Sequence, residues 1–220
     1  MIRTDSNRVF LAPAEYVDSD HAVVTKIARH LALENESADL AMLAVRIFRH
    51  VREIRYDAPD FDRLDSFKAS TLLLERRGYC VPKASAFAAL CRASGIPSRL
   101  GFADVTNHLA NPKTLELMGG PTFAWHGYAE VLLKGRWLKV SPTFDSSTCE
   151  RMRANVLEFD GASDAHLQPF DRSGRNFMTY ENFHGVFHDV PARFLASEMK
   201  RLYPRAYQAI RSAQLSSKKA

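Results

Sequence analysis

Residues 78–97 have the sequence GYCVPKASAFAALCRASGIP, and here the chain changes from helical to strand periodicity. Pro82 is tolerated in the first turn of a helix, so a helix can begin near Cys80. Gly95 and Pro97 are expected to end it. The residues with helical spacing are Ala84, Phe87, Ala88, Leu90 and Cys91.

Helical periodicity also precedes this stretch. Apolar residues between Val23 and Leu31 share one face of a helix that Asp18-Ser19-Asp20 can cap. A second and more strongly amphipathic helix is expected from near Ser37 to Ile54. Ser66 can then cap a short helix that stops at Gly78.

After Pro97 the apolar pattern has a period of two, which indicates antiparallel strands. We expect them at residues 99–105, 123–133 and 136–140, with Lys134-Gly135 as the turn of a hairpin. Helices first and an antiparallel sheet afterwards indicate an α+β fold.

The remaining chain is less patterned. Residues 1–17 are expected to be irregular or extended, residues 146–190 to be loops with short strands, and residues 192–212 a closing helix. No internal repeat or linker interrupts the sequence. We therefore expect one domain over residues 1–220.

Composition limits the classes of function. The chain has 30 basic and 25 acidic residues, a net charge of +5, and three cysteines. An odd number of cysteines does not form a disulfide framework, and no segment resembles a signal peptide or a bilayer-spanning run. We therefore expect a cytoplasmic protein with no membrane partner. Zinc-finger and basic–aromatic motifs are absent, so no nucleic acid is expected, and the oligomeric state is left open.

Cys80 has the features of a reactive thiol. It lies in the first turn of its helix, where unpaired backbone N–H groups carry partial positive charge and stabilise a thiolate. We therefore expect its pKa to lie well below the ordinary value of about 8.5. The alternative is a small buried core residue, which is the role expected of Cys91.

His126 lies on the first strand of the hairpin. Counting back from the Lys134-Gly135 turn puts Thr143 opposite His126. Ser141 and Asp145 then occupy the two diagonal positions, roughly 7–8 Å away at Cβ. A carboxylate at one imidazole nitrogen would fix the tautomer and leave the other nitrogen for the thiol.

These motifs together resemble the transglutaminase-like superfamily, whose core is a papain-like cysteine catalytic unit. The resemblance covers residues 40–145 and leaves 146–220 as a C-terminal extension. It implies that Cys80 is the nucleophile and His126 the base. It rests on Gly78-Tyr79-Cys80, Arg92-Ala93-Ser94-Gly95-Ile96-Pro97-Ser98-Arg99, His126, and Trp137 ahead of Pro142-Thr143. A bacterial branch is indicated by Asn107-His108-Leu109 and Phe159-Asp160-Gly161.

One position departs from the family pattern. The superfamily usually has Asp directly before Pro-Thr, whereas this chain has Ser141. Asp145 can take over from the other diagonal, Ser141 can act as an uncharged orienting group, or the site has lost much of its activity. We favour Asp145, so the expected catalytic residues are Cys80, His126 and Asp145.

The expected reaction is attack of the thiol on a carboxamide or peptide carbonyl, giving an acyl thioester that water or an amine resolves. This describes a protease, deamidase or amide transferase with a protein or peptide substrate. A binding module that keeps the fold without turnover is the alternative.

A metal site at His184-Gly185-Val186-Phe187-His188 is a third alternative, because the two histidines have helical ligand spacing. The segment contains a glycine and lacks the zincin glutamate. Surface or strand histidines are therefore expected there. We expect neither a metal nor a cofactor.

Overall fold

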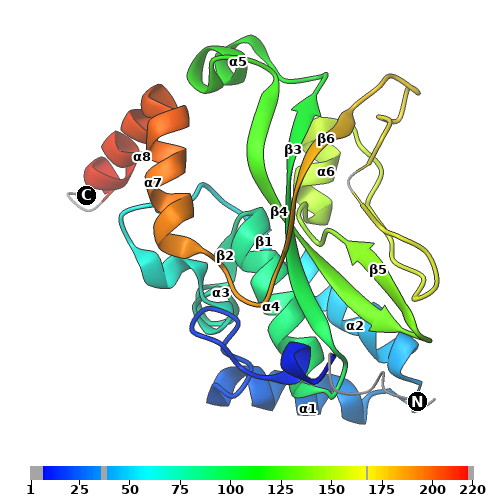
Figure 1. Ribbon diagram of the computed structural model, residues 1–220. Coiled ribbons are helices and arrows are strands. Elements are labelled where there is room, and N and C mark those ends of the chain that lie inside the picture. The colour runs from blue at the N-terminus through cyan, green and yellow to red at the C-terminus, as the bar shows by residue number, and fades with distance from the viewer. Residues whose placement is uncertain (1–6, 36–38, 167, 218–220) are drawn as a thin grey trace.

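The computed structural model describes residues 7–35, 39–166 and 168–217 (Figure 1). A four-stranded antiparallel sheet has the order β5-β4-β3-β6, and a two-residue parallel pair, β1 and β2, lies apart from it. The strands are β1 (Arg55–Tyr56), β2 (Arg77–Gly78), β3 (Ser98–Asn107), β4 (Thr122–Leu133), β5 (Arg136–Val140) and β6 (Met178–Phe187). The helices are α1 (Ala22–Leu33), α2 (Leu40–Arg52), α3 (Ala69–Glu75), α4 (Cys80–Ala93), α5 (Pro112–Met118), α6 (Ser146–Met152), α7 (Ala192–Leu202) and α8 (Pro204–Ser217), with short 3₁₀ helices at Arg8–Leu11 and Leu64–Phe67.

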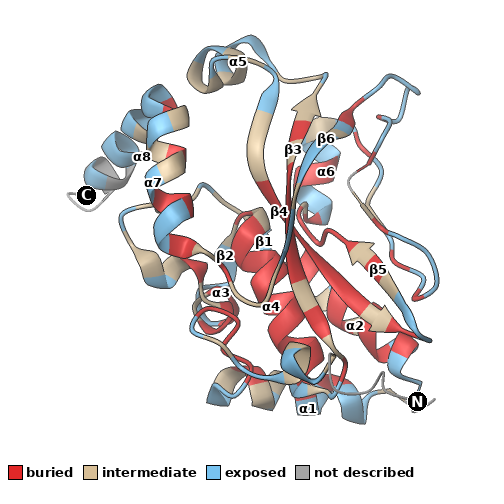
Figure 2. Cartoon of the chain, viewed as in Figure 1, coloured by how far each residue is buried: buried red, intermediate tan, exposed pale blue. Residues whose placement is uncertain are grey.

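Helix α4 is the centre of the core. Every residue from Val81 to Arg92 is buried, so the helix is covered on all sides (Figure 2). It contacts α1, α2 and α3 as well as strands β3 and β4. A helix with no solvent-exposed face must be covered by other elements on every side. The N-terminal helices and the sheet therefore pack on α4, as expected for the α+β fold.

The hairpin of β4 and β5 has the predicted register. Leu133 pairs with Arg136, and the pairing continues to Ala129 and Val140. Lys134 and Gly135 both have positive φ, 48° and 77°. This geometry is that of a turn whose twist matches the two strands.

The caps of two helices, α1 and α3, differ from the predictions. The ring of His21 caps α1 by accepting from the Val23 N–H, and Lys68 precedes α3 without a side-chain cap. Asp39 caps α2, while Ser37 lies outside the described residues. The predicted caps act elsewhere: Asp18 accepts from the Ser70 N–H, and the Ser66 hydroxyl donates to the Asp60 carbonyl.

Two elements between residues 146 and 190 differ from the predicted loops with short strands. These are α6 and the ten-residue strand β6, which pairs with β3 at the edge of the sheet. Strand β6 is mostly exposed, so its sequence lacks an apolar period of two. The predicted closing helix is also two helices, because Pro204 has no N–H to continue α7.

Helices α7 and α8 pack beside the upper half of β4, across from α5 (Figure 1). Met199, Tyr203 and Ala206 form an apolar cluster there with Trp125 and Met118. Polar contacts fix the same helices, since Asp62 accepts from both Lys200 Nζ (2.6 Å) and Tyr207 Oη (2.9 Å). Among the described helices, none has the length and hydropathy needed to cross a membrane.

Candidate active site

Cys80 is the first residue of α4, as predicted, and its side chain is half-buried. Burial raises the pKa of its thiol to about 11, although the backbone N–H groups of Gly127, Val81 and Cys80 itself act in the opposite direction. The expectation of a lowered thiol pKa is therefore not met. The helix start supplies the expected N–H groups, but removal from water outweighs them.

His126 lies on β4 directly after a β-bulge. The bulge falls between Ala103 and Val105 of the neighbouring strand, and Trp125 has a φ of 58°. The His126 side chain is only 8% exposed. Burial, with the neighbouring His166, lowers the pKa of the imidazole to about 3, so the ring is neutral at pH 7.

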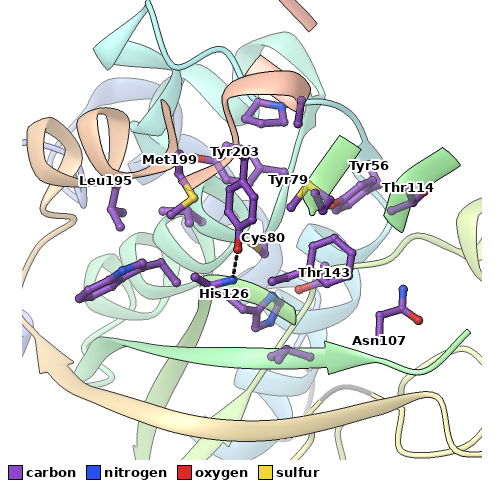
Figure 3. Close-up of a pocket in the computed structure, with 18 of the residues that line it drawn as sticks. Tyr56, Tyr79, Cys80, Asn107, Thr114, His126, Thr143, Leu195, Met199 and Tyr203 are labelled. Atoms are coloured by element: carbon purple, nitrogen blue, oxygen red, sulfur yellow. Dashed lines mark hydrogen bonds between the residues drawn. The ribbon is translucent and has the colours of Figure 1, made fainter. Parts of the chain in front are cut away.

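Cys80 and His126 line one pocket of about 380 Å³ (Figure 3). The N–H of Gly127, which follows His126, points to the Cys80 sulfur. A Cβ added at Gly127 would lie 3.0 Å from the Val81 Cα, so α4 and β4 approach closely at this point. A side chain at this position would press on Val81, the residue after Cys80, so glycine permits the close approach of the two elements.

Ser141 is the group that contacts His126. Its Oγ lies 3.1 Å from His126 Nε2 and 2.9 Å from Thr143 Oγ1. The Ser141 N–H donates to the Ala165 carbonyl, which fixes the backbone of this residue. If His126 Nε2 donates to Ser141, the Nδ1 atom is left as the proton acceptor.

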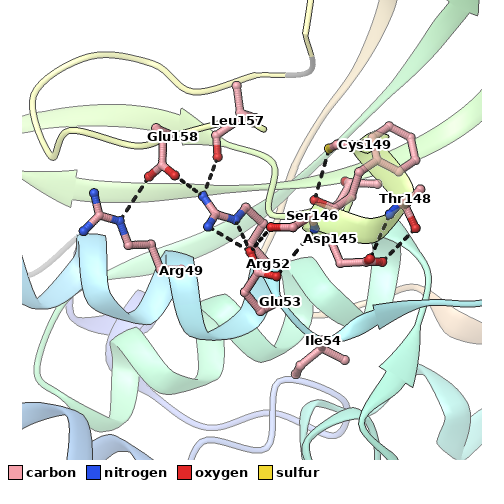
Figure 4. Close-up of polar contacts among 12 residues, drawn as sticks. Arg49, Arg52, Glu53, Ile54, Asp145, Ser146, Thr148, Cys149, Leu157 and Glu158 are labelled. Carbon is pink, nitrogen blue, oxygen red and sulfur yellow. Dashed lines mark hydrogen bonds and ion pairs between the residues drawn. The ribbon is translucent and has the colours of Figure 1, made fainter. Parts of the chain in front are cut away.

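The structure does not bring Asp145 to His126, contrary to the favoured prediction. Asp145 caps α6, with Oδ1 accepting from the Thr148 N–H (2.9 Å) and Oδ2 from the Tyr56 N–H (2.7 Å) and Thr148 Oγ1 (2.8 Å) (Figure 4). Burial alone would raise its pKa, but these hydrogen bonds hold the pKa below its ordinary value. Asp145 does not occupy the predicted diagonal position beside His126, because strand pairing ends at Val140 and the chain then turns toward Ala165.

Lys83 is a site residue that the sequence analysis missed. It is fully buried one turn after Cys80, and its Nζ donates to the carbonyls of Arg52 (2.8 Å), Ile54 (2.7 Å) and Thr143 (2.8 Å). Burial lowers its pKa to about 7, while Asp145 raises it. The available signal was a lysine within an otherwise apolar helix. Lys83 ties the Thr143 loop, which follows Ser141, to α4.

A histidine–carboxylate pair, His184 and Asp104, supports the bulge at Trp125. Asp104 Oδ1 accepts from the Trp125 N–H (3.1 Å) and lies 2.7 Å from His184 Nε2. The His184 ring stacks on Trp125 with centroids 4.0 Å apart. His188, the other histidine of the weighed metal motif, lies beside Arg92. Within the described residues, no group of three His, Cys, Asp or Glu side chains could hold a metal ion.

The other two cysteines are set apart from the pocket. Cys91 is fully buried in α4, as predicted, and burial raises its pKa to about 12. Cys149 is buried in α6. All three cysteines are free.

Comparison with known proteins agrees with the motifs. The profile of the transglutaminase-like superfamily matches residues 26–142, which is more than half of the chain. The chain therefore belongs to the transglutaminase-like superfamily, and its α+β fold is the papain-like, transglutaminase-like type.

Several solved structures are similar. A candidate cysteine protease from Cytophaga hutchinsonii has a TM-score of 0.47 at 18% identity, over 84% of this chain and 56% of that one. The periplasmic domain of TgpA from Pseudomonas aeruginosa has a TM-score of 0.42 at 21% identity, over 64% of this chain and 48% of that one. The chain thus spans about half the length of these structures. No curated protein matches it.

Proposed function

We propose that the chain is a cysteine-dependent enzyme that cleaves or transfers an amide through an acyl thioester. Cys80 is the nucleophile, His126 the base, and Ser141 the residue that orients His126. The observation that carries this proposal is the shared pocket of the thiol and the imidazole, with the Gly127 N–H directed at the sulfur. Membership of the transglutaminase-like superfamily supports the same chemistry.

The reaction begins from a neutral pair, because burial raises the thiol pKa and lowers the imidazole pKa. As Cys80 Sγ bonds to the carbonyl carbon, the thiol proton passes to His126 Nδ1. The imidazolium then protonates the leaving amine and the C–N bond breaks, leaving the acyl group on sulfur. Attack by water gives a carboxylic acid and restores the thiol, whereas attack by an amine gives a new amide. The Cys80 N–H at the helix start is an available donor to the developing oxyanion.

We also propose that residues 1–220 act as one unit on a protein or peptide. The pocket is walled by the family core and by α7 and α8 of the C-terminal extension, which supports a single domain. The free cysteines support a reducing compartment such as the cytoplasm.

An activity-based probe tests the catalytic assignment. A peptide acyloxymethyl ketone is expected to label the wild-type protein at Cys80, located by mass spectrometry of the digest. Cys80→Ala should abolish labelling, while Cys149→Ala, a matched change at a buried thiol, should leave it intact. Labelling that persists in Cys80→Ala would mean that the nucleophile is another residue.

A binding module is the second candidate, favoured by the high thiol pKa of about 11 and by the uncharged Ser141 beside His126. Iodoacetamide alkylation separates the two. In an enzyme, His126 accepts the thiol proton as Sγ attacks, so His126→Gln should slow alkylation of Cys80 at pH 7 at least about tenfold. In a module, His126→Gln should leave the alkylation rate unchanged.

A further inference from the structure

The pocket that holds Cys80 and His126 has an unusual lining for an amide-transfer site. Among the described residues, no Asp, Glu, Lys or Arg lines it. Its walls come from separate elements, with Met118 on α5, Met152 on α6, Met178 on β6, and Leu195 and Met199 on α7. Figure 3 shows Leu195, Met199 and Tyr203 on one side of Cys80, with Tyr56 and Thr114 on another.

Such a lining discriminates by charge. An ammonium or carboxylate group that entered would lose its hydration and find no ionic partner, which costs several kcal/mol (roughly 2–7 even for a neutral amide without a hydrogen bond). An apolar group would instead gain free energy from leaving water, about 0.8 kcal/mol per methylene. The flexible methionine side chains can adapt to its shape.

The size of the pocket indicates what fits. Its volume is about 380 Å³. An apolar cavity of about 150 Å³ already binds benzene, and small-ligand sites span about 300–1,000 Å³. The pocket therefore has room for a group larger than one phenyl ring next to the thiol.

Hydrogen bonds hold the α7–α8 wall in place. Tyr203 Oη accepts from the Ala124 N–H (2.5 Å) and donates to the Thr122 carbonyl (3.3 Å). Asp62 binds Lys200 and Tyr207 at the outer edge of the same wall. A pocket fixed by hydrogen bonds to strand β4 is preformed, so little binding free energy is lost in ordering it.

From these observations we propose that the pocket binds a bulky, uncharged, apolar acyl group, such as an aromatic or branched aliphatic side chain next to the carbonyl that Cys80 attacks. The inference rests on the proposed function, because it assigns the acyl donor of that reaction. It makes the enzyme selective for apolar residues over glutamine, glutamate and lysine at the acyl position.

Binding to the Cys80→Ala variant tests the pocket without turnover. The probes are benzyloxycarbonyl-phenylalaninamide, -glutaminamide and -lysinamide, titrated by calorimetry. We expect the phenylalanine amide to bind at least about tenfold more tightly than the other two. Affinities within threefold of one another, or tighter binding of the glutamine or lysine amide, would overturn the proposal. Because this readout does not use the thiol, a protein that fails to react with the ketone probe can still show the apolar preference.

A second experiment places a charge in the pocket lining. Met118→Lys introduces an ammonium from a half-buried position on α5. It should weaken binding of the phenylalanine amide at least about tenfold. The matched control is Glu116→Lys, an exposed position of the same helix that does not line the pocket, and it should leave the affinity unchanged. Equal losses in both variants, with both folded by circular dichroism, would contradict the assignment.

Discussion

His126 has an uncharged partner, Ser141, at its Nε2 atom. Ser141 fixes the ring through a 3.1 Å contact to Nε2, and Thr143 in turn fixes the Ser141 hydroxyl. This arrangement sets the tautomer but supplies no negative charge to stabilise an imidazolium. Since the imidazole pKa is already lowered to about 3 by burial, the resting pair is neutral.

Restoring a carboxylate at this position should therefore increase reactivity. In Ser141→Asp, the new charge beside Nε2 should raise the pKa of His126 by about 1–3 units and lower that of the thiol. We expect the rate of Cys80 alkylation by iodoacetamide at pH 7 to rise at least about tenfold.

Ser141→Asn is the matched control, because it has nearly the shape of aspartate without the charge. It should leave the alkylation rate within about threefold of wild type. Equal rates in the Asp and Asn variants would show that charge at this position does not govern the thiol. Thermal denaturation of each variant establishes that it is folded.

Sequence reasoning succeeded for single residues whose position follows from a local pattern. Cys80 at a helix start and His126 on a strand both follow from periodicity, and both lie where predicted. The choice between Ser141 and Asp145 depended on a register extended past the last paired residue, Val140. The bridge to Ala165 that redirects the chain there involves a distant loop, so no local pattern contains it.

Among the elements, helix α4 is attached to its surroundings through Lys83. Lys83 on this helix joins the end of α2 to the loop after β5 through three carbonyl acceptors, Arg52, Ile54 and Thr143. The three acceptors match the three N–H groups of an ammonium. The anchor holds the Ser141–Thr143 segment in the position from which it contacts His126.

Lys83→Met should be strongly destabilising. It fills a similar volume but leaves three carbonyl groups without their donor, each at a cost of about 1–3 kcal/mol. Because the substitution also removes the cost of burying the ammonium, we expect the free energy of unfolding, measured with urea at pH 7, to fall by less than the sum of these costs, about 2–4 kcal/mol. Lys26→Met, an exposed position on α1, should change it by no more than about 0.5 kcal/mol. A loss no larger than that of Lys26→Met would mean that the three contacts contribute no net stability.

Elements were predictable where burial imposes a period. The β4–β5 hairpin has such a period and agrees with the structure within a few residues. Helix α4 is buried on all sides and has no such period, and its bounds were predicted from Pro82, Gly95 and Pro97 instead. Strand β6 exposes most of its residues at the sheet edge, so backbone pairing with β3 determines it instead of an apolar pattern. The predicted helix caps were wrong for a related reason. Asp18 and Ser66 form hydrogen bonds with residues elsewhere in the chain instead of capping the helices that follow them.

At the scale of the whole molecule, the pocket lies where distant parts of the chain meet. Helix α4 supplies the thiol, the sheet supplies the histidine, and α7 and α8 form an apolar wall. The fold class followed from the order of helices and strands. The positions of α7 and α8 could not be predicted in this way. An amphipathic pattern identifies the apolar face of a helix but not the surface that this face covers.

The buried neutral His126 should make the whole fold sensitive to acid. Its folded pKa is about 3 against an ordinary value of 6.5, so between these values the unfolded chain binds the proton more readily. The stability linked to this group is thus complete above pH 6.5 and is lost as the pH falls. Between pH 7 and pH 5 the wild-type protein should lose about 2 kcal/mol more unfolding free energy than His126→Gln, measured with urea. His108→Gln, at an exposed histidine outside the pocket lining, is the matched control. An identical loss in wild type and His126→Gln would mean that the imidazole has the same pKa in the folded and unfolded protein, so that burial does not lower it.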